Sequence, residues 1–466
     1  MSSPSASAGS AIASLAAGGE VAVLGLGRSG LAAAELLHRH SARVYASDAG
    51  SSDALRAAAS SLVALGISAE VGTHDLDRIR RASALVVSPG VPPDAAPLAA
   101  AREAGVTVVS EVELALRAMP GVPCIAVTGT NGKTTVTALV AHLLRAMGHA
   151  AIEAGNIGTP LSTVALESTR PEWISLELSS FQLHDTPSVA PTVAVLTNLS
   201  PNHLDRYESL EAYYADKALL FRNATQTSVR VVNAEDPASL RLTAGVPGIV
   251  RSFSVDGARA DATFDAATQT LMLEGAPLLE RALWPLLGAH NVANALAASL
   301  AVWQALPTER TTAGRARLAG GLRSFRALPH RLEPLGEREG VLWVNDSKAT
   351  NVGAARVAIA AMERPIVLLL GGRHKGEPYA GLLETMAGKV RAVLAFGEAS
   401  PKIAADLKGR VAVEECGSSF SSVIARAREI ARSGDVVLLA PACSSYDMFT
   451  NYEERGAAFR QLALGE

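Results

Sequence analysis

The sequence is poor in aromatic residues and cysteines and contains no long hydrophobic run. Aromatic residues make up 4% of the 466 positions, and the three cysteines, Cys124, Cys416 and Cys443, lie far apart without a C-x-x-C spacing. This pattern indicates neither a disulfide framework nor a structural zinc site. No run approaches the roughly 20 apolar residues that a membrane helix needs, and residues 1–19 lack the basic and apolar segments of a secretory signal. We therefore expect a soluble cytoplasmic protein without a membrane partner.

Charge is also sparse and evenly spread. Charged residues make up 19% of the chain, the formal net charge is -3, and the lysines and arginines are dispersed. A surface for nucleic acid or an anionic membrane needs concentrated basic residues, so the sequence indicates neither partner. The hydrophobic content of 48% is typical of a well-packed globular protein. We expect small-molecule substrates and a monomeric chain.

The length exceeds what one hydrophobic core supports, and the apolar pattern predicts three α/β units in series. Short apolar runs alternate with Ala-rich helical segments, and we expect these runs to form strands: EVAVLG, RVYAS, ALVVS and TVVS; then PCIAVT, WISLEL, TVAVLT, VRVV, GIVRSFSV and TLMLEG; and finally VLWVND, IVLLLGG, RAVLAFG and DVVLLAPA. We expect domains at residues 1–117, 118–326 and 327–466, with residues 1–19 as a loose tail.

The stretch TGTNGKTT, residues 128–135, predicts a phosphate-binding loop. It follows the apolar run CIAV and precedes a segment with apolar residues at helical spacing. Gly129 and Gly132 allow backbone N–H groups to approach phosphate oxygens, Lys133 supplies a positive charge, and Thr134 can ligate Mg²⁺. The full P-loop pattern would have glycine where this chain has Val127. ATP or GTP is the expected ligand, and the alternative is a Gly-rich turn with an incidental lysine.

A second nucleotide-type motif, GLGRSG at residues 25–30, follows the first predicted strand and opens a helix. Asp48 ends the next strand, where a dinucleotide-binding fold places an acidic residue. Ser88, in SPG, ends another strand of the same sheet. This loop could bind NAD, FAD or another diphosphate compound such as a nucleotide sugar, or it could be a tight turn that needs glycine for geometry alone.

Three further residues suggest chemistry near the phosphate loop. Glu177 ends a strand that is apolar on both sides, where a carboxylate needs a cation or an ion pair. His203 also follows a strand and could be functional or structural. Lys217 lies on an apolar helical stripe with Tyr213, Leu220 and Phe221. It could extend its amine to solvent, or, if buried, react in its neutral form with CO₂ to give a carbamate.

Several motifs together resemble the Mur ligase family and occur in the family order along nearly the whole chain. They are TGTNGKTT, GNIG, LELSSFQL, NHLDRY, the Lys217 helix, HNVANALAA, PHRLE, NDSKATN, GGRHKG and PACSSYDMF. ELSSFQL and NDSKATN resemble the members that add D-glutamate. The resemblance implies an N-terminal Rossmann-like parallel sheet, a central P-loop ATPase-like α/β domain and a C-terminal Rossmann-like α/β domain. The implied activity is ATP-dependent addition of D-glutamate to UDP-N-acetylmuramoyl-L-alanine through an acyl phosphate, in peptidoglycan precursor synthesis.

The resemblance also assigns the site residues. It places the UDP end of the substrate, rather than NAD, at Gly25, Gly27, Arg28, Ser29, Asp48, Ser88 and Asn156. It places ATP at Gly129, Thr130, Asn131, Gly132, Lys133, Thr134, Thr135, Asn294, Arg331 and Asp346. The implied catalytic residues are Lys133, Glu177, His203 and Lys217. The resemblance implies two Mg²⁺ ions, with Thr134, Glu177, His203 and Lys217 as a carbamate as their ligands. D-Glutamate is assigned to Lys348, Thr350, Lys375, Ser445, Tyr446 and Tyr452. At the positions of the two tyrosines we would expect residues that are more purely apolar.

The sequence leaves alternatives open. The chain could add another amino acid, since related ligases share the phosphate loop and magnesium residues. Folate-glutamating enzymes are a more remote alternative, because the extra N-terminal domain with the GLGRSG motif argues against them. A nicotinamide-dependent oxidoreductase would account for residues 25–48 but leave TGTNGKTT unused. A non-catalytic nucleotide-binding module would account for both loops but not for Glu177, His203 and Lys217 together.

Overall fold

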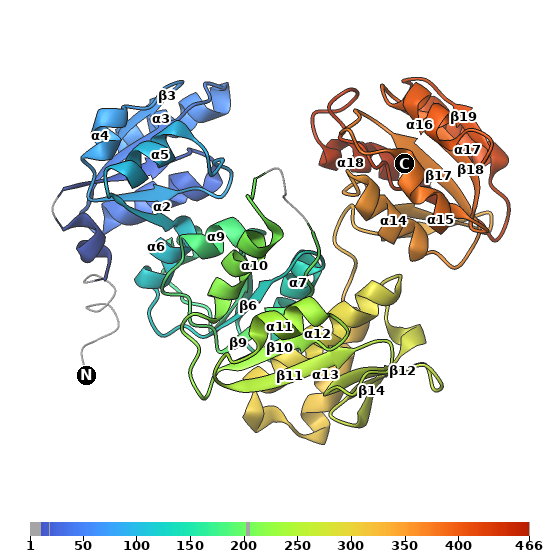
Figure 1. Cartoon of the computed structure of the whole chain (residues 1–466), viewed down its shortest axis with the longest axis horizontal. Helices are drawn as coiled ribbons and strands as arrows, with labels where there is room; N and C mark the ends of the chain where they lie inside the picture. The colour runs from blue at the N-terminus through green and yellow to red at the C-terminus, as the bar shows by residue number, and fades with distance from the viewer. Residues whose placement is uncertain (1–10, 18, 202–205, 466) are drawn as a thin grey trace. The chain divides into compact units, whose positions relative to one another are not determined.

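A computed structural model describes residues 11–17, 19–201 and 206–465. Its strands form three sheets, of five, nine and six strands, in chain order (Figure 1). The chain divides into two compact units, residues 1–281 with 293–323, and residues 282–292 with 324–466. The first unit contains the five- and nine-stranded sheets, and the second contains the six-stranded sheet. The predicted α/β class with three sheets is confirmed, while the predicted domain boundaries stay a prediction.

The five-stranded sheet is parallel throughout and has the order β3-β2-β1-β4-β5. Its strands are β1 (Glu20–Leu24), β2 (Arg43–Asp48), β3 (Ser68–Val71), β4 (Ala84–Val87) and β5 (Thr107–Ser110). Its helices are α2 (Arg28–Arg39), α3 (Asp53–Ala64), α4 (Leu76–Arg80), α5 (Ala96–Glu103) and α6 (Glu111–Ala118). The strand order reverses between β1 and β4, and such a switch point opens a crevice at the carboxyl ends of the strands.

The expectation of a loose tail at residues 1–19 is wrong for part of that segment. Residues 11–16 are helical, and Ile12 and Leu15 are 0% and 5% exposed. Both side chains belong to the hydrophobic core that contains Val21 and Leu36. The Ala- and Ser-rich composition hid these two apolar side chains, whose burial stabilises the helical turn against the sheet.

The nine-stranded sheet has the order β14-β13-β12-β11-β10-β9-β6-β8-β7. Its strands are β6 (Cys124–Thr128), β7 (Ala151–Gly155), β8 (Trp173–Glu177), β9 (Val193–Leu196), β10 (Val229–Asn233), β11 (Ile249–Ser254), β12 (Ala262–Asp265), β13 (Thr270–Leu273) and β14 (Ala276–Glu280). The pairings from β7 to β12 are parallel, and β12, β13 and β14 pair antiparallel. The accompanying helical segments are α7 (Lys133–Ala146), α8 (Leu161–Leu166), α9 (Ser180–His184), α10 (Leu210–Ala218), η1 (Leu219–Phe221), α11 (Pro237–Thr243), η2 (Arg281–Leu283), α12 (Ala289–Ala305), η3 (Pro307–Glu309) and α13 (Thr312–Ser324).

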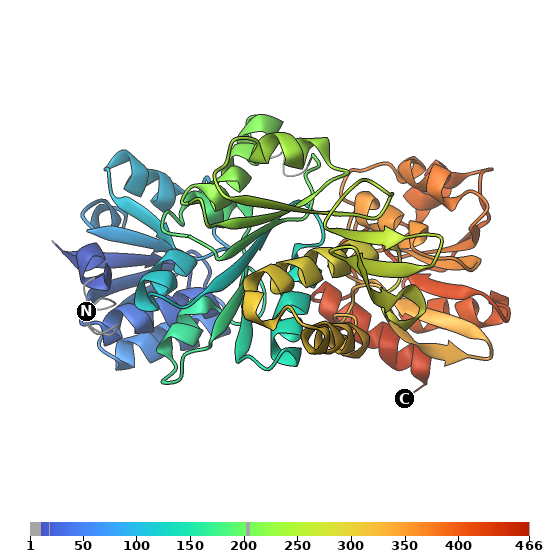
Figure 2. The ribbon, with the colours of Figure 1, turned by 90° about the horizontal axis from the view of Figure 1, so that it is seen from below.

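The central strands of this sheet are fully buried because helices cover both of its faces. Every residue of β6, β8 and β9 is buried, as expected for parallel strands with continuous apolar runs. Figure 2 shows the green helices α10 and α11 on one side of the sheet and the yellow helices α12 and α13 on the other. A charged side chain at the end of such a strand, such as that of Glu177 in β8, is therefore withdrawn from solvent.

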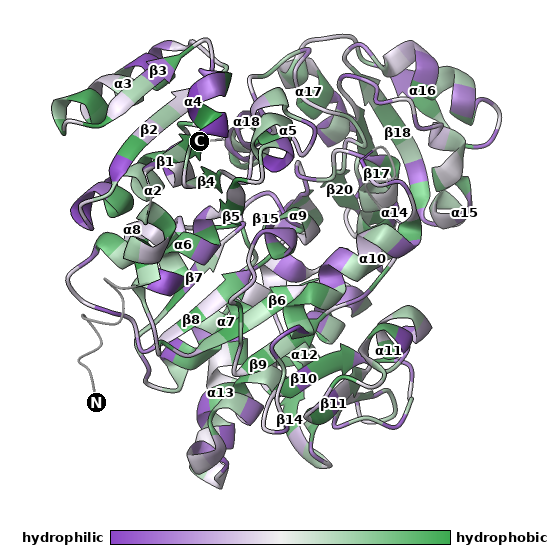
Figure 3. Cartoon of the chain, turned by 60° about the vertical axis from the view of Figure 1, so that its left-hand side comes forward, coloured by the Kyte–Doolittle hydropathy of each residue, from purple (hydrophilic) through white to green (hydrophobic). Residues whose placement is uncertain are grey.

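The six-stranded sheet has the order β15-β16-β20-β17-β18-β19, and only β15 and β16 pair antiparallel among its described strands. Its strands are β15 (Glu333–Arg338), β16 (Val341–Asn345), β17 (Ile366–Gly371), β18 (Val390–Phe396), β19 (Val413–Glu415) and β20 (Val436–Leu439). Its helical segments are α14 (Val352–Ala360), η4 (Tyr379–Leu382), α15 (Leu383–Met386), α16 (Ser400–Leu407), α17 (Phe420–Ile430) and α18 (Tyr452–Leu464). Figure 3 shows β18 and β20 coloured as hydrophobic, as their burial requires.

Candidate active site

The TGTNGKTT segment forms the predicted loop between β6 and α7. Gly129 and Gly132 have positive φ angles of 142° and 79°. A Cβ atom added at Gly129 would lie 2.0 Å from Thr197 Oγ1, and one at Gly132 would lie 2.5 Å from Asn294 Oδ1. Both positions therefore require glycine for steric as well as conformational reasons. The closeness of Asn294 to the loop brings one predicted nucleotide-binding residue of α12 to this site.

The loop is held by the segment that follows β9. The backbone N–H of Thr130 donates to Asn198 O at 2.8 Å, and the N–H of Asn131 donates to Asn198 Oδ1 at 3.0 Å. The Thr197 hydroxyl donates to Asn131 O at 2.6 Å. Lys133 Nζ donates to Thr130 O at 2.8 Å, so its charge lies over the loop. Thr134 and Thr135 lie in the first turn of α7, whose N-terminus adds a partial positive charge.

Glu177 lies at the carboxyl end of β8 and is only 1% exposed. Its Oε1 atom accepts a hydrogen bond from Asn156 Nδ2 at 2.9 Å. Its Oε2 atom is buried and has no hydrogen-bond partner within the described part of the chain. A buried carboxylate oxygen without a donor costs free energy, so the residues present fit a cation at this oxygen.

Lys217, on α10, is 1% exposed, which excludes the alternative of an amine extended to solvent. Its Nζ donates to Gly129 O at 2.8 Å and lies 4.6 Å from the centroid of the Tyr213 ring. Burial, together with the positive charge of Lys133, lowers the pKa of the Lys217 amine to about 7, while Asp216 and Glu177 oppose this shift. The structure thus brings Lys217 and the phosphate loop together.

The last member of the predicted metal set, His203, lies outside the described residues. Within residues 11–17, 19–201 and 206–465, no group of three or more His, Cys, Asp or Glu side chains is arranged to hold a metal ion. The predicted set is Thr134, Glu177, His203 and a modified Lys217, of which all but His203 lie in the described residues.

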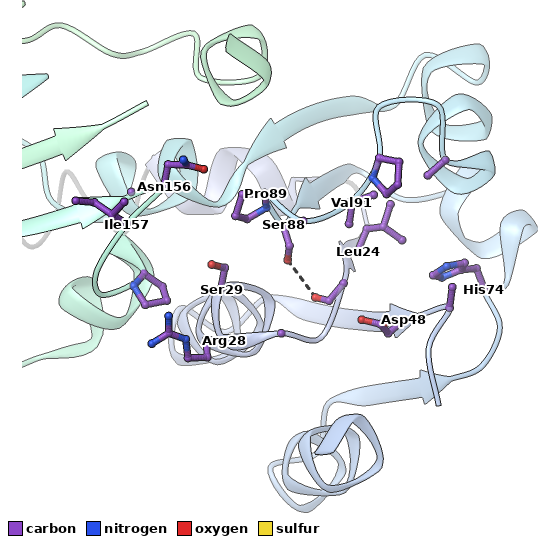
Figure 4. A pocket seen from close by; sticks show the side chains of 18 of the residues that line it. Leu24, Arg28, Ser29, Asp48, His74, Ser88, Pro89, Val91, Asn156 and Ile157 are labelled. Carbon is purple, nitrogen blue, oxygen red and sulfur yellow. Dashed lines mark hydrogen bonds between the residues drawn. The ribbon is translucent and has the colours of Figure 1, made fainter. Parts of the chain in front are cut away.

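All seven residues predicted to bind the UDP end line one cavity of about 480 Å³. Figure 4 shows Arg28 and Ser29 at the start of α2, Asp48 towards one end of the cavity, and Asn156 towards the other. Ser88 Oγ donates to Gly25 O at 3.1 Å (dashed line in Figure 4). The structure therefore brings together residues from four separate segments of the sequence.

Asp48 has a role in this cavity that the sequence did not indicate. Its two carboxylate oxygens accept hydrogen bonds from the backbone N–H groups of Leu26 and Gly50, each at 2.8 Å. The carboxylate therefore fixes the Gly-rich loop at the mouth of the cavity. At the turn itself, a Cβ added at Gly30 would lie 1.7 Å from Gly25 O, so close packing requires glycine there.

Sequence reasoning missed His74 and Ile157 as cavity residues. His74 Nδ1 lies 2.9 Å from Ser47 Oγ, and burial lowers the pKa of its imidazole. His74 follows β3, a short strand whose residues are half-buried or exposed. The sequence therefore has no apolar run there that would predict a strand leading to His74. Ile157 is in the GNIG motif beside Asn156, and that adjacency was the available signal.

In the second unit, Asp346 follows β16 and accepts a hydrogen bond from the N–H of Leu332 at 3.2 Å. Burial raises the pKa of its carboxyl to about 7, against the opposing effects of the Leu332 N–H and the charge of Arg331. Lys348 Nζ lies 3.8 Å from the centroid of the Tyr452 ring, a cation–π contact. Two predicted D-glutamate residues are thus in contact.

The other predicted D-glutamate residues differ in exposure. Ser445 is 3% exposed and Thr350 is half-buried. The backbone N–H of Thr350 donates to Lys348 O at 2.8 Å. Lys375 is exposed, and Tyr446 is 65% exposed.

Sequence reasoning also missed Arg455, the largest fully buried side chain described. Arg455 donates to Ser347 Oγ at 3.0 Å and Ser347 O at 2.9 Å, and also to Cys443 O at 3.3 Å. It therefore ties the Lys348 segment to the Ser445 segment.

The first unit has the features of a nucleotide-dependent phosphate-loop enzyme, with a buried carboxylate and a buried amine beside the loop. Comparison with known proteins gives the family. The model for the Mur ligase MurD-like N-terminal domain matches residues 19–110, that for the Mur ligase middle domain matches 127–302, and that for the Mur ligase glutamate ligase domain matches 330–443.

Similarity extends over nearly the whole chain. The chain is 42% identical to the UDP-N-acetylmuramoylalanine--D-glutamate ligase of Acidobacterium capsulatum, with 96% of each sequence covered. It is 40% identical to the enzyme of the same name from Myxococcus xanthus, covering 96% of this chain and 98% of that one. The structure of UDP-N-acetylmuramate-alanine ligase MurC from Thermotoga maritima has the same fold, with a TM-score of 0.59, 20% identity and coverage of 96% of this chain and 99% of that one. The chain belongs to the Mur ligase family.

Proposed function

We propose that this chain is an ATP-dependent ligase that joins D-glutamate to UDP-N-acetylmuramoyl-L-alanine in peptidoglycan precursor synthesis. The observation that carries the proposal is 42% identity, over 96% of the chain, to a ligase named for that substrate and that amino acid. The cavity at the N-terminal sheet and the phosphate loop supply the two phosphate-binding features that such a reaction needs.

The UDP end of the substrate binds in the 480 Å³ cavity in this proposal. The N-terminus of α2, with the N–H groups of Arg28 and Ser29, offers a partial positive charge to a diphosphate. Asn156 lines this cavity and also donates to Glu177, so the cavity adjoins the buried carboxylate near the phosphate loop. This connection supports placing the far end of the substrate beside the γ-phosphate of ATP.

ATP phosphates bind at residues 129–135 in this proposal, with Lys133 and the α7 N-terminus facing the negative charge. Asn294 lies beside Gly132, where it can contact the nucleotide. Arg331 and Asp346 belong to the second compact unit, and we assign them to the same nucleotide by the family resemblance.

Mg²⁺ is the cation assigned to the orphan oxygen of Glu177. Thr134, Glu177, His203 and the carbamate of Lys217 would hold it, and when bound it neutralises charge on phosphate oxygens. The carbamate forms when the neutral Lys217 amine attacks the carbon of CO₂ and the nitrogen loses one proton. Burial of the amine and its lowered pKa support this step, because an appreciable fraction is then neutral near pH 7.

Amide formation proceeds through an activated acyl group in this proposal, because a carboxylate is a poor electrophile. The L-alanyl carboxylate attacks the γ-phosphorus of ATP, ADP leaves, and an acyl phosphate forms. The amine of D-glutamate then attacks the acyl carbon, His203 accepts a proton, and inorganic phosphate leaves. Lys348 and Lys375 hold the two glutamate carboxylates by charge-assisted hydrogen bonds, and Thr350, Ser445, Tyr446 and Tyr452 complete the pocket.

We also propose the domain boundaries, the oligomeric state and the cellular location of the chain. Domain boundaries lie near residues 117–118 and 326–327, and the chain acts as a monomer in the cytoplasm. None of the described helices is long and apolar enough to cross a membrane.

The proposal is tested by phosphate release from MgATP with UDP-N-acetylmuramoyl-L-alanine. D-Glutamate is compared with L-glutamate, L-alanine and meso-diaminopimelate as acceptors. We expect release that requires both the nucleotide sugar and D-glutamate. Release with a different amino acid would keep the ligase class and overturn the acceptor assignment, and the absence of release with every acceptor would contradict the function.

A further inference from the structure

A second cavity, of about 330 Å³, lies at the amino-terminal ends of β9 and β10, whereas the phosphate loop lies at the carboxyl ends of the strands of the same sheet. Thr192, which precedes β9, and Val229, the first residue of β10, line it. The phosphate loop is bonded instead to Thr197 and Asn198, which follow the carboxyl end of β9. The two sites therefore occupy the two ends of the same strand, and nothing in the proposed ligase reaction uses this second cavity.

The cavity contains a buried arginine, Arg230, for which none of the described residues supplies a carboxylate partner. Arg230 is 7% exposed, and it pairs in register with Ala194 of β9, so both side chains lie on the same face of the sheet and both line the cavity. Arg230 Nη1 donates to Pro247 O at 3.1 Å, whereas Nε is buried and without a hydrogen-bond partner in the described part of the chain. No described residue that lines the cavity is acidic.

A buried guanidinium that lacks a counter-ion destabilises the folded chain unless an anion compensates it. Burial lowers the pKa of Arg230, yet arginine remains protonated under physiological conditions, so the charge persists. The buried Nε–H can therefore donate to an anion from outside the chain, and the cavity is where such an anion can reach the arginine.

The walls define the chemical class of that anion. Leu220, Phe221 and Val246 give apolar surface, which favours an organic molecule over an inorganic ion. Asn223 also lines the cavity, but its amide nitrogen donates to Pro187 O and Val189 O, so it contributes an acceptor more readily than a donor. A dianion such as a phosphate monoester would need more than Arg230, the one cation among the described residues that line the cavity, whereas a carboxylate matches a single guanidinium in charge and in planar geometry.

We propose that this cavity binds a small organic monocarboxylate whose carboxylate pairs with Arg230. Its position also connects it to the candidate active site. Leu220 and Phe221 form part of η1, which continues directly from α10, the helix that carries Lys217. A bound molecule contacts the chain three residues after Lys217, so occupancy stabilises the end of the helix that holds the buried amine.

The test is isothermal titration calorimetry of the full-length protein with benzoate, using benzamide as the neutral probe of the same shape and phenyl phosphate as the dianionic probe. We expect benzoate to bind at millimolar concentration and at least about tenfold more tightly than benzamide or phenyl phosphate. Equal binding of benzoate and benzamide, tighter binding of phenyl phosphate, or no binding of benzoate would each overturn the proposal.

Two variants locate the site. Arg230→Gln removes the charge and is expected to weaken benzoate binding by about tenfold or more. Ala224→Leu leaves Arg230 in place but adds volume at a residue that lines the cavity, and it is expected to block benzoate as well. Unfolding temperatures are measured for both, so that if Arg230→Gln fails to fold, Ala224→Leu decides the question. Unchanged benzoate binding in a folded variant would place the ligand elsewhere and overturn the assignment, independently of any result on ligase activity.

Discussion

Lys217 shows how far a single residue's surroundings can depart from what its position along the chain indicates. The sequence places it on an apolar helical stripe, which is compatible with an amine that extends to solvent and with one that is buried. The partner that decides between them, Gly129 O, is 88 positions away in the chain. Only the folded arrangement of α10 against the phosphate loop reveals that the amine is enclosed.

Replacing Lys217 with alanine is expected to lower phosphate release by about 100-fold or more, because the site would lose the carbamate that we propose as a ligand of the metal ion. Short carboxylates such as acetate or propionate should restore part of the activity by occupying the vacated volume. Initial rates with and without these acids measure the effect, with the exposed Lys408→Ala as the control. Failure of every acid to restore activity, together with ¹³C NMR that detects no carbamate under ¹³CO₂, would contradict the modification.

Lys133→Ala is expected to reduce ATP turnover by about 100-fold or more while leaving the fold intact, because the charge that faces the phosphates is lost. Circular dichroism and the unfolding temperature report the fold, and phosphate release reports the turnover. Wild-type turnover in this variant would contradict the assignment of residues 128–135 as the ATP-binding loop.

Asp346 gives the folded chain a defined pH dependence. Its pKa is about 7 in the folded state against an ordinary value of 3.8, so between these values the folded state holds more protons than the unfolded state. Stability associated with this group is therefore present below about pH 4 and is lost as the pH rises through about 7, by up to about 4 kcal/mol.

Urea denaturation of the wild type and of Asp346→Asn between pH 5 and pH 8 measures this effect. The neutral amide cannot ionise, and it can still accept the Leu332 N–H, so its stability should fall less over this range than that of the wild type. Parallel curves for the two proteins would show that Asp346 does not titrate in this range.

At the scale of elements, Gly129 of the phosphate loop is required both by its positive φ angle and by a close steric contact. Gly121 provides a comparison, because its φ angle is also positive, at 83°, but a Cβ there would meet no atom within 4 Å. At Gly129 the added atom would lie 2.0 Å from Thr197 Oγ1, at the end of β9. The loop is therefore fixed by contact with a neighbouring strand end as well as by its own backbone conformation.

Gly121→Ala is expected to cost about 1 kcal/mol, the usual strain of a positive φ in a residue with a Cβ. Gly129→Ala should cost more and should also weaken ATP binding, because the loop must shift away from Thr197. Denaturation and ATP titrations of the two variants measure the difference. Equal stability and equal ATP affinity would mean that the contact at Gly129 relaxes freely.

The elements that the sequence predicted are those with long or continuous apolar runs. Strands such as β6, β8 and β17 were predictable because every residue in them is buried. The strands β3, β15 and β19 were not, because exposed and half-buried residues interrupt their apolar pattern. The helical segment at residues 11–16 was missed because only two of its side chains signal burial.

For the whole molecule, local motifs predicted the phosphate loop and the Gly-rich turn, while long-range placement had to come from the fold. That Asn156 lines the cavity of Gly25 and Ser88 and also donates to Glu177 follows from the packing of the N-terminal sheet against residues 155–160. The role of Arg455 was equally hidden, since its partners lie 11 to 108 positions away. No spacing within the sequence encodes such contacts.

The central claim is that the γ-phosphoryl group passes to the substrate carboxylate before the amide forms. The most direct measurement uses UDP-N-acetylmuramoyl-L-alanine labelled with ¹⁸O in the L-alanyl carboxylate, MgATP and D-glutamate, with mass spectrometry of the phosphate and of the peptide product. An acyl phosphate predicts one ¹⁸O atom in each phosphate released and the other retained in the new amide. Unlabelled phosphate released together with the amide product would mean that no oxygen passes from the carboxylate to the phosphoryl group, and it would contradict the proposed reaction.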